Sequence, residues 1–322
     1  MTLVTESYLV ASADQDIRLY VRNTRPDGLS TFSAERTLLF VHGATYPSDT
    51  MFDLKIDGTS WMDTIASHGY DVYAMDVRGF GRSTRPPEMD RPPAENAPVV
   101  TTDDGVSDFG AVVDHIRQRR GVPRLNVMGW SWGTVIAGAY AAAYPDKVER
   151  LVMYAPLWLR RTPGGLRVDG PMGAYRTVTL EAAMLRWLNG VAAHRQQALI
   201  PPGVIESWWA ANMDADPVGA KMAPPAVRAP NGLLADGFRY WEADTRYYDP
   251  SAIRAPVLMV VGEWDVDTPA SMAQALLARL PNSPRKRLVI IGEGTHHLML
   301  ERNRTQMFNE VQTFLAEPVK VS

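Results

Sequence analysis

The sequence predicts an α/β fold, with a mostly parallel central sheet and helices on both of its faces. Short apolar runs alternate with predicted helices along most of the chain, a pattern typical of parallel sheets. Several of these runs are apolar at every position, as expected for strands whose two faces are both buried. The chain has 322 residues, of which 46% are hydrophobic, and this is ample for a large core.

The predicted elements follow from these runs. An antiparallel pair of strands comes first, over residues 8–10 and 17–21. The later strands cover residues 37–41, 71–75, 125–128, 151–155, 257–261 and 288–291. The predicted helices cover residues 61–67, 102–119, 131–143, 269–280 and 301–315.

The alternation stops between Pro156 and about Tyr248, where the sequence indicates helices and loops with many aromatic residues. We therefore expect residues 1–156 and 249–322 to form the core, and residues 157–248 to form an inserted helical cap. The alternative is a helical subdomain that does not contact the functional site. The cap is favoured because small-molecule pockets often lie between such units.

Composition and charge argue against several classes of function. The net charge of −3 gives no electrostatic reason to expect nucleic acid or an anionic membrane as a partner. The absence of cysteine excludes disulfides, thiolate metal sites and cysteine nucleophiles. Neither a signal peptide nor an apolar run of about 18 residues is found. We expect a cytoplasmic protein that acts on a small molecule without a cofactor or a metal, and the sequence does not predict its oligomeric state.

The sequence Gly-Trp-Ser-Trp-Gly, from Gly129 to Gly133, separates a predicted strand from a predicted helix of small residues. A Gly-x-Ser-x-Gly turn at such a place holds its serine in a strained backbone conformation, and the glycines let neighbouring backbone pass close by. The hydroxyl of Ser131 would then stand free at the end of the sheet, beside a helix N-terminus that favours negative charge. The pattern predicts a nucleophilic serine.

A serine nucleophile needs a base, usually histidine, and an acidic side chain that orients it. Asp265 and His296 each lie in a segment that directly follows a predicted strand. Together with Ser131 they would meet at the carboxyl edge of the sheet, where open parallel sheets bind ligands. Asp267 and His297 remain the alternative acid and base.

These motifs together resemble the α/β-hydrolase superfamily. The resemblance covers nearly the whole chain except the cap, and it rests on His42-Gly43 and on residues 76–83, 129–133, 262–265 and 294–301. It implies that Ser131 attacks an acyl carbon, that His296 carries the proton and that Asp265 orients the imidazole. It also implies an oxyanion hole made by the backbone amides of Trp132 and Ala44.

The same resemblance bears on neighbouring residues. Family members often carry a glutamate five residues beyond the histidine, and Glu301 at this spacing favours His296 over His297. We expect His42 to make structural hydrogen bonds near the site, and Asp76 and Arg78 to tie loops together. The two adjacent histidines do not suggest a metal site, because no further ligand motif accompanies them.

The substrate-binding candidates are Thr45, Trp130, Trp158, Trp187 and His297. Aromatic side chains line small-molecule sites, although they also form ordinary cores. Trp132 is a candidate for one wall of an acyl pocket. The predicted cap also holds arginines, one of which would pair with a substrate carboxylate: Arg160, Arg161, Arg167, Arg176, Arg186 and Arg195.

The predicted function is hydrolysis of a small carboxylic ester. A monoalkyl phthalate is a candidate substrate, because the cap is rich in aromatic residues and arginines and because hydrolases of such esters are similar in layout. One alternative is a prolyl-aminopeptidase-like enzyme, although the His-Gly-Gly-Pro-Gly stretch of those enzymes is replaced here by His-Gly-Ala-Thr-Tyr over residues 42–46. The others are a carbon–carbon bond hydrolase, which usually has asparagine at the position of Trp130, and a ligand receptor with slow turnover. A haloalkane dehalogenase is disfavoured because its nucleophile is aspartate.

Overall fold

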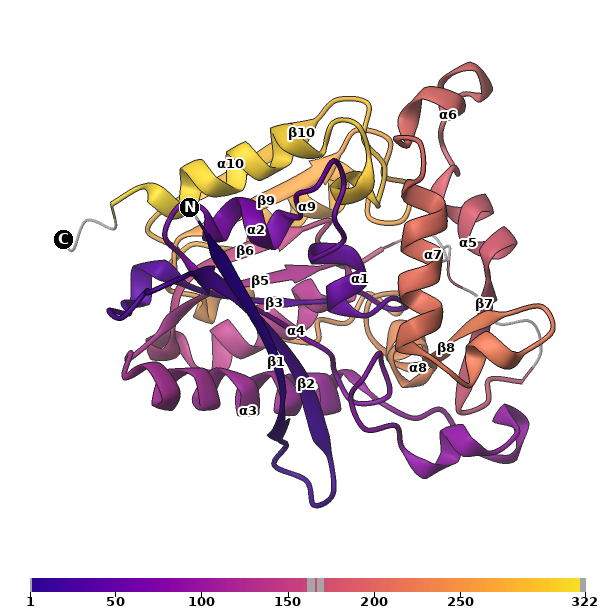
Figure 1. Ribbon diagram of the computed structural model, residues 1–322. Helices are drawn as coiled ribbons and strands as arrows, with labels where there is room; N and C mark the ends of the chain where they lie inside the picture. Colours follow the sequence, from indigo (N-terminus) through magenta and orange to yellow (C-terminus); the bar gives the residue numbers. More distant parts are fainter. Residues whose placement is uncertain (1, 161–165, 167–170, 319–322) are drawn as a thin grey trace.

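The computed structural model describes residues 2–160, 166 and 171–318. Within these residues a main sheet has the strand order β1-β2-β4-β3-β5-β6-β9-β10 (Figure 1). Its strands are β1 (Leu3–Ala11), β2 (Arg18–Pro26), β3 (Thr37–Val41), β4 (Asp71–Met75), β5 (Leu125–Trp130), β6 (Val148–Tyr154), β9 (Val257–Gly262) and β10 (Lys286–Ile291). The pairs β1–β2 and β2–β4 are antiparallel, and every other pair in this sheet is parallel.

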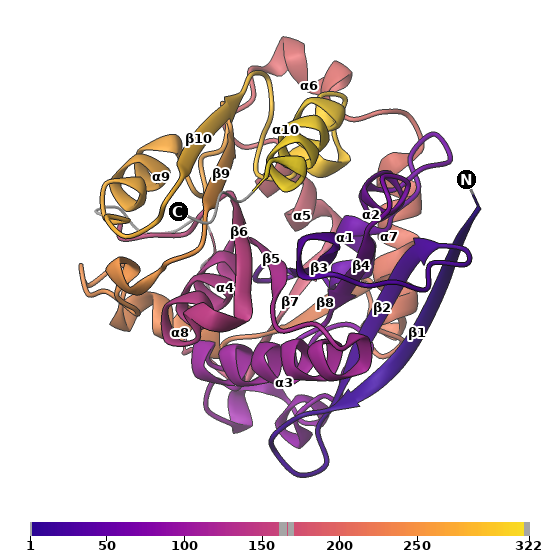
Figure 2. The ribbon, with the colours of Figure 1, turned by 90° about the vertical axis from the view of Figure 1, so that its left-hand side faces the viewer.

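Helices cover both faces of the sheet, as predicted. On one face lie α1 (Ser48–Phe52), α2 (Trp61–Ala66) and α10 (Arg304–Ala316), and on the other lie α3 (Thr102–Arg120), α4 (Trp132–Ala143) and α9 (Ala270–Leu277) (Figures 1 and 2). Alternate residues of a central strand therefore enter different cores. In β3, Leu38 and Phe40 pack with α2 and α10, whereas Leu39 and Val41 pack with α3 and α4. This two-sided burial is the physical reason for the continuous apolar runs.

The opening hairpin is longer than predicted, since β1 and β2 each span 9 residues. In β1, exposed residues such as Thr5, Ser7 and Leu9 alternate with less exposed ones. A strand at the edge of a sheet needs no continuous apolar run, so the sequence pattern did not show where these two strands begin and end.

Between β6 and β9 the chain leaves the main sheet and forms α5 (Leu180–Trp187), α6 (Ala193–Leu199), α7 (Val204–Ala215) and α8 (Gly232–Arg239). It also forms a separate antiparallel pair, β7 (Tyr175–Thr179) and β8 (Ala226–Pro230), which was not predicted. Both strands are 5 residues long and contain an arginine at an inner position, and this hid them in the sequence. No helix within the described residues is both long and apolar enough to cross a membrane.

A buried ion cluster joins the hairpin, the loop after β4 and helix α3. Asp108, whose side chain is fully buried, accepts hydrogen bonds from Nε and Nη2 of Arg78 at 2.9 and 2.6 Å and from the Ser12 hydroxyl at 2.7 Å. Asp14 also pairs with Arg78, at 2.5 Å. Arg78 therefore ties loops together, as its sequence context suggested.

Replacing Asp108 by alanine would leave the Arg78 guanidinium buried without its main partner. We expect the free energy of unfolding to fall by about 3 kcal/mol or more. The matched control is Asp114→Ala on the same helix, where the carboxylate is half exposed and binds Arg117 and Lys147. That change should cost less than about 1 kcal/mol. Urea unfolding of both variants measures the difference, and equal losses would contradict this account of the cluster.

Candidate active site

Ser131 lies in the sharp turn between β5 and α4, with φ 55° and ψ −120°. This strained conformation depends on two close backbone approaches. A Cβ atom on Gly129 would lie 2.1 Å from the carbonyl oxygen of Gly133, and one on Gly133 would lie 2.5 Å from that of His42. Only glycine fits at these two positions. The Ser131 amide donates to the Tyr154 carbonyl at 3.0 Å and thereby anchors the turn to β6.

The structure brings Asp265 and His296 together at the same edge of the sheet. His296 Nδ1 lies 2.8 Å from Asp265 Oδ2, and both side chains are buried. Asp265 also accepts hydrogen bonds from the amides of Asp267 and Thr268 at 2.9 and 2.8 Å and from the Thr268 hydroxyl at 2.9 Å. These donors orient the carboxylate toward the imidazole. Asp267, the alternative acid, lies in the same region, but its carboxylate pairs with Arg186 at 2.8 Å.

Two side chains that the sequence did not assign to this task hold the backbone of His296. Trp130 Nε1 and the Tyr154 hydroxyl both donate to the His296 carbonyl oxygen, at 3.0 and 2.8 Å. His296 Nε2 is buried, and no described residue forms a hydrogen bond with it. The imidazole is thus held at Nδ1 and through its own backbone, and Nε2 is left to accept a proton.

The backbone amides of the two predicted oxyanion residues, Trp132 and Ala44, donate no hydrogen bond to any described residue. Trp132 begins α4, so its amide lies at the positive end of a helix. His42 fixes the Ala44 amide, because its Nδ1–H donates to the Gly43 carbonyl at 2.6 Å while its Nε2 accepts from Val77 at 3.0 Å. The C=O of Gly43 and the N–H of Ala44 belong to one trans peptide and point in opposite directions, so a fixed carbonyl also fixes the direction of the N–H. Burial lowers the pKa of His42 to about 4, which keeps this ring neutral.

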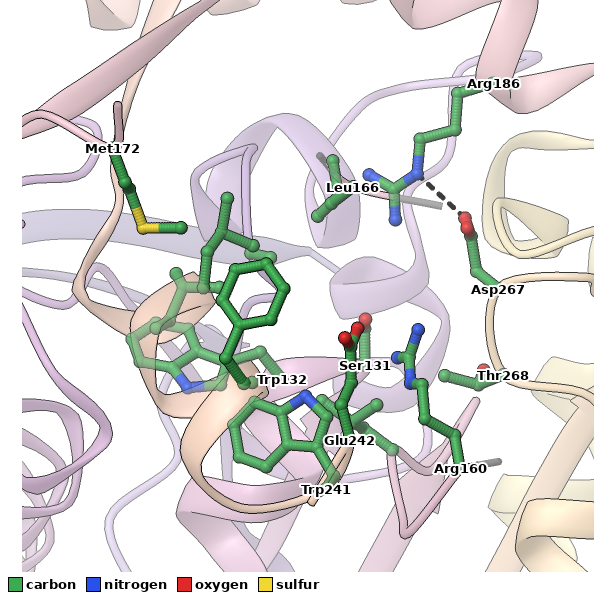
Figure 3. A pocket seen from close by; sticks show the side chains of 16 residues that line it. Ser131, Trp132, Arg160, Leu166, Met172, Arg186, Trp241, Glu242, Asp267 and Thr268 are labelled. Carbon is green, nitrogen blue, oxygen red and sulfur yellow. Dashed lines mark hydrogen bonds and ion pairs between the residues drawn. The ribbon is translucent and has the colours of Figure 1, made fainter. Parts of the chain in front are cut away.

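A pocket opens beside Ser131 (Figure 3). One side of it is polar and carries Arg160, Arg186, Asp267 and Thr268. The remaining wall is largely apolar and comes mostly from the segment between β6 and β9: Leu157, Leu166, Met172, Leu233, Leu234, Phe238 and Trp241. Ala44, Ser131 and Trp132 complete it, so the candidate nucleophile and both candidate oxyanion residues line one cavity.

Trp132, the candidate for a wall of the acyl pocket, lines this pocket, but the five residues named as substrate-binding candidates do not. Trp158 packs edge-on to Tyr248, and Thr45 binds Arg176 at 3.1 Å and lines a neighbouring pocket. Trp130 packs between Tyr154 and His296, and Trp187 stacks on His297 with ring centroids 4.7 Å apart. Burial, with the nearby charges of His296 and Arg186, holds the pKa of His297 well below its ordinary value. Trp130, Trp158, Trp187 and His297 are all buried, so their rings pack in the core of the protein.

The arginines of the inserted segment separate into distinct environments. Arg186 pairs with Asp267 at 2.8 Å. Burial alone would raise the pKa of Asp267, but Arg186 holds it below its usual value. Arg195 pairs with Glu293 on the surface. Burial lowers the pKa of Arg160, and the nearby charges of Glu242 and Asp267 oppose this shift. Arg161 and Arg167 lie outside the described residues.

Glu301 supports the loop that carries His296. Its carboxylate is fully buried and accepts hydrogen bonds from the Thr295 hydroxyl, from the Thr295 amide at 3.0 Å and from Trp187 Nε1 at 2.8 Å. Burial raises the pKa of Glu301 to about 7. Glu301 therefore acts on His296 through Thr295 and does not touch the imidazole, and it links that loop to α5.

The pair of donors on the His296 carbonyl leads to a test by double-mutant cycle. Tyr154→Phe and Trp130→Phe each remove one donor, and the carbonyl keeps the other. We expect the double variant to lose about 1 kcal/mol more stability than the sum of the single losses, because only then is a buried carbonyl left unpaired. Urea unfolding of all four proteins measures this coupling. Strict additivity would show that the two donors act independently of each other.

Comparison with known proteins places this site in a family. The family model described as serine aminopeptidase, S33, matches residues 33–303. A proline iminopeptidase from Xylella fastidiosa is 36% identical over 92 residues, which are 29% of this chain and only 26% of that relative.

Solved structures share the whole fold. A serine hydrolase from the polyaromatic hydrocarbon-degrading bacterium Cycloclasticus zankles is 14% identical, with a TM-score of 0.65 over 97% of this chain and 98% of that chain. The naproxen esterase of Bacillus subtilis is 18% identical, with a TM-score of 0.60 over 97% and 92% of the two chains. These likenesses confirm the predicted α/β-hydrolase fold. With the family model matching most of its length, the chain belongs to the serine aminopeptidase S33 family of α/β-hydrolase-fold serine hydrolases.

Proposed function

We propose that the protein hydrolyses a small carboxylic ester through an acyl-enzyme intermediate. The observation that carries the proposal is the 2.8 Å contact between Asp265 and His296 at the sheet edge that also presents Ser131 in its strained turn. These are the three groups that activate a serine hydroxyl: a nucleophile, a base and an acid that orients the base.

In the proposed reaction, Ser131 Oγ attacks the ester carbon and His296 Nε2 takes the hydroxyl proton. Asp265 holds the imidazole and stabilises its cation. The amides of Trp132 and Ala44 would receive the negative charge that develops on the carbonyl oxygen. His296 then gives its proton to the leaving alcohol, and a water molecule, activated by the same base, releases the acid.

The inserted segment is proposed as a cap, because its residues before β7, in α5, in α8 and just after α8 line the pocket over Ser131. The mixed walls of this pocket favour an acyl group with an apolar body and an anionic end. Arg160 is the arginine that we assign to such a carboxylate, because it lines the pocket and Arg186 is already paired with Asp267. A monoester of an aromatic dicarboxylic acid, such as a monoalkyl phthalate, has this shape and charge.

The first test is ester hydrolysis by wild type and by Ser131→Ala. Short p-nitrophenyl esters and a monoalkyl phthalate are the substrates. The variant should lose at least about a thousandfold in kcat, because the nucleophile is gone while the fold remains. Ser251→Ala, which changes a partly exposed serine outside the pocket, is the matched control and should keep the wild-type rate. Equal rates for wild type and Ser131→Ala would rule out Ser131 as the nucleophile.

The second test concerns Arg160. Changing Arg160 to methionine keeps a long apolar stem and removes the charge. We expect kcat/KM for monoethyl phthalate to fall about 10- to 100-fold, which corresponds to one lost charge-assisted hydrogen bond, while diethyl phthalate is turned over as before. Arg195→Met, which removes a surface arginine of the same segment, should change neither rate. An equal effect of Arg160→Met on both esters would contradict binding of a substrate carboxylate.

A peptidase is the second candidate, favoured by the family match and by the likeness to a proline iminopeptidase over part of the chain. An aminopeptidase must bind a substrate ammonium group, and the acidic residues that line the pocket are Glu242 and Asp267, the latter paired with Arg186. Proline p-nitroanilide distinguishes the two proposals. Faster Ser131-dependent cleavage of this amide than of any ester would favour the peptidase.

A further inference from the structure

Arg176 connects the inserted segment to the loop that follows β3. It lies on β7, opposite Ala229 of β8, and its residue is 8% exposed. On one side, Nη1 donates to the Pro230 carbonyl at 2.6 Å and to Asn231 Oδ1 at 3.3 Å. On the other side, Nη2 donates to the Ala44 carbonyl at 2.5 Å and to the Thr45 hydroxyl at 3.1 Å.

This guanidinium is buried without a carboxylate partner among the described residues. Its hydrogen-bond acceptors among the described residues are carbonyl, amide and hydroxyl oxygens, which solvate the charge without neutralising it. Burial, and next the nearby charge of Arg186, lower the pKa of Arg176 to about 9. The side chain therefore remains a cation at neutral pH. An uncompensated buried cation is costly, and a negative charge that forms nearby would offset part of that cost.

The other buried arginine of this small sheet differs in this respect. Arg228, on β8, pairs with Asp216 through Nη2 at 2.8 Å and donates to the Met89 carbonyl at 3.0 Å. It has a counter-ion, and it forms no hydrogen bond with residues 42–46. Arg228 binds Asp216 within the inserted segment and the loop near Met89. Arg176, in contrast, binds the loop that lines the candidate active site.

We propose that Arg176 is a positioning residue for the oxyanion hole: it fixes the Ala44–Thr45 peptide and supplies positive potential beside the Ala44 amide. The inference rests on the proposed acyl-transfer chemistry. His42 holds the Gly43 carbonyl, which precedes the Ala44 amide, and Arg176 holds the Ala44 carbonyl, which follows it. With both neighbouring carbonyls held, the Ala44 amide keeps its direction while charge develops on the substrate oxygen. Such fixed donors need no reorganisation during the reaction.

The test compares Arg176→Met, Arg176→Lys and the control Arg228→Lys with wild type. For each protein that folds by circular dichroism, kcat and KM are measured on a p-nitrophenyl ester, together with the inhibition constant of a trifluoromethyl ketone, which forms a tetrahedral oxyanion adduct. We expect Arg176→Met to lose about 10- to 100-fold in kcat with a nearly unchanged KM, and to bind the ketone more weakly by a similar factor. Arg176→Lys keeps the charge but cannot reach both sides, so its losses should be intermediate.

A purely structural role would lower the melting temperature of the Arg176 and Arg228 variants while kcat and ketone binding of the folded proteins stay at wild-type levels. That result would overturn the inference, as would an equal loss of kcat in Arg228→Lys. If Arg176→Met does not fold, Arg176→Lys decides, and a wild-type kcat for it counts against the proposal.

The failure of the proposed function can be told apart from the failure of this inference. If wild type hydrolyses no ester, the rate at which a fluorophosphonate labels Ser131 replaces kcat, because phosphonylation also places negative charge on an oxygen in the same hole. Slower labelling of Arg176→Met than of Arg228→Lys would then support the role of Arg176. Equal labelling rates would refute it.

Discussion

The strained turn at Ser131 is the constraint on which the rest of the site depends. A positive φ at a serine is unfavourable, and the packing of β5 and α4 against β3 and β6 must hold it. The close approach of Gly133 to the backbone at the end of β3 fixes the distance between the serine turn and the loop of His42 and Ala44. The same backbone contact therefore sets the positions of the candidate nucleophile and of one candidate oxyanion donor.

The two tryptophans beside the serine serve different parts of this arrangement. Trp130 points away from the pocket and donates to the His296 carbonyl, so it connects the serine turn to the histidine loop. Trp132 lines the pocket and donates to the Thr102 hydroxyl at 3.1 Å, so it connects the same turn to the start of α3. A smaller residue at either position would remove both the hydrogen bond and a large part of the packing around Ser131.

The inserted segment contributes more than walls to the pocket. Trp187 of α5 binds Glu301, which in turn holds Thr295 next to His296. Arg176 of β7 binds the loop of Ala44 from the other side. Both connections come from buried polar groups whose partners lie more than a hundred residues away in the chain. Because each connection is buried, a movement of the segment would displace both the loop of His296 and the loop of Ala44.

The sequence by itself determined the succession of core strands and helices along the chain, because strands buried on both faces have continuous apolar runs. It also singled out Ser131, Asp265 and His296, because each follows the end of such a run. It did not reveal β7 and β8, which are short, carry arginines and belong to no main sheet. The tertiary structure alone decided which acidic residue contacts His296. It also decided that Arg186 pairs with Asp267, whereas Arg176 has no carboxylate partner among the described residues. It also placed Trp130, Trp158 and Trp187 in packed surroundings and not on the pocket wall. These outcomes depend on partners distant in the sequence, so local sequence pattern and composition could not predict them.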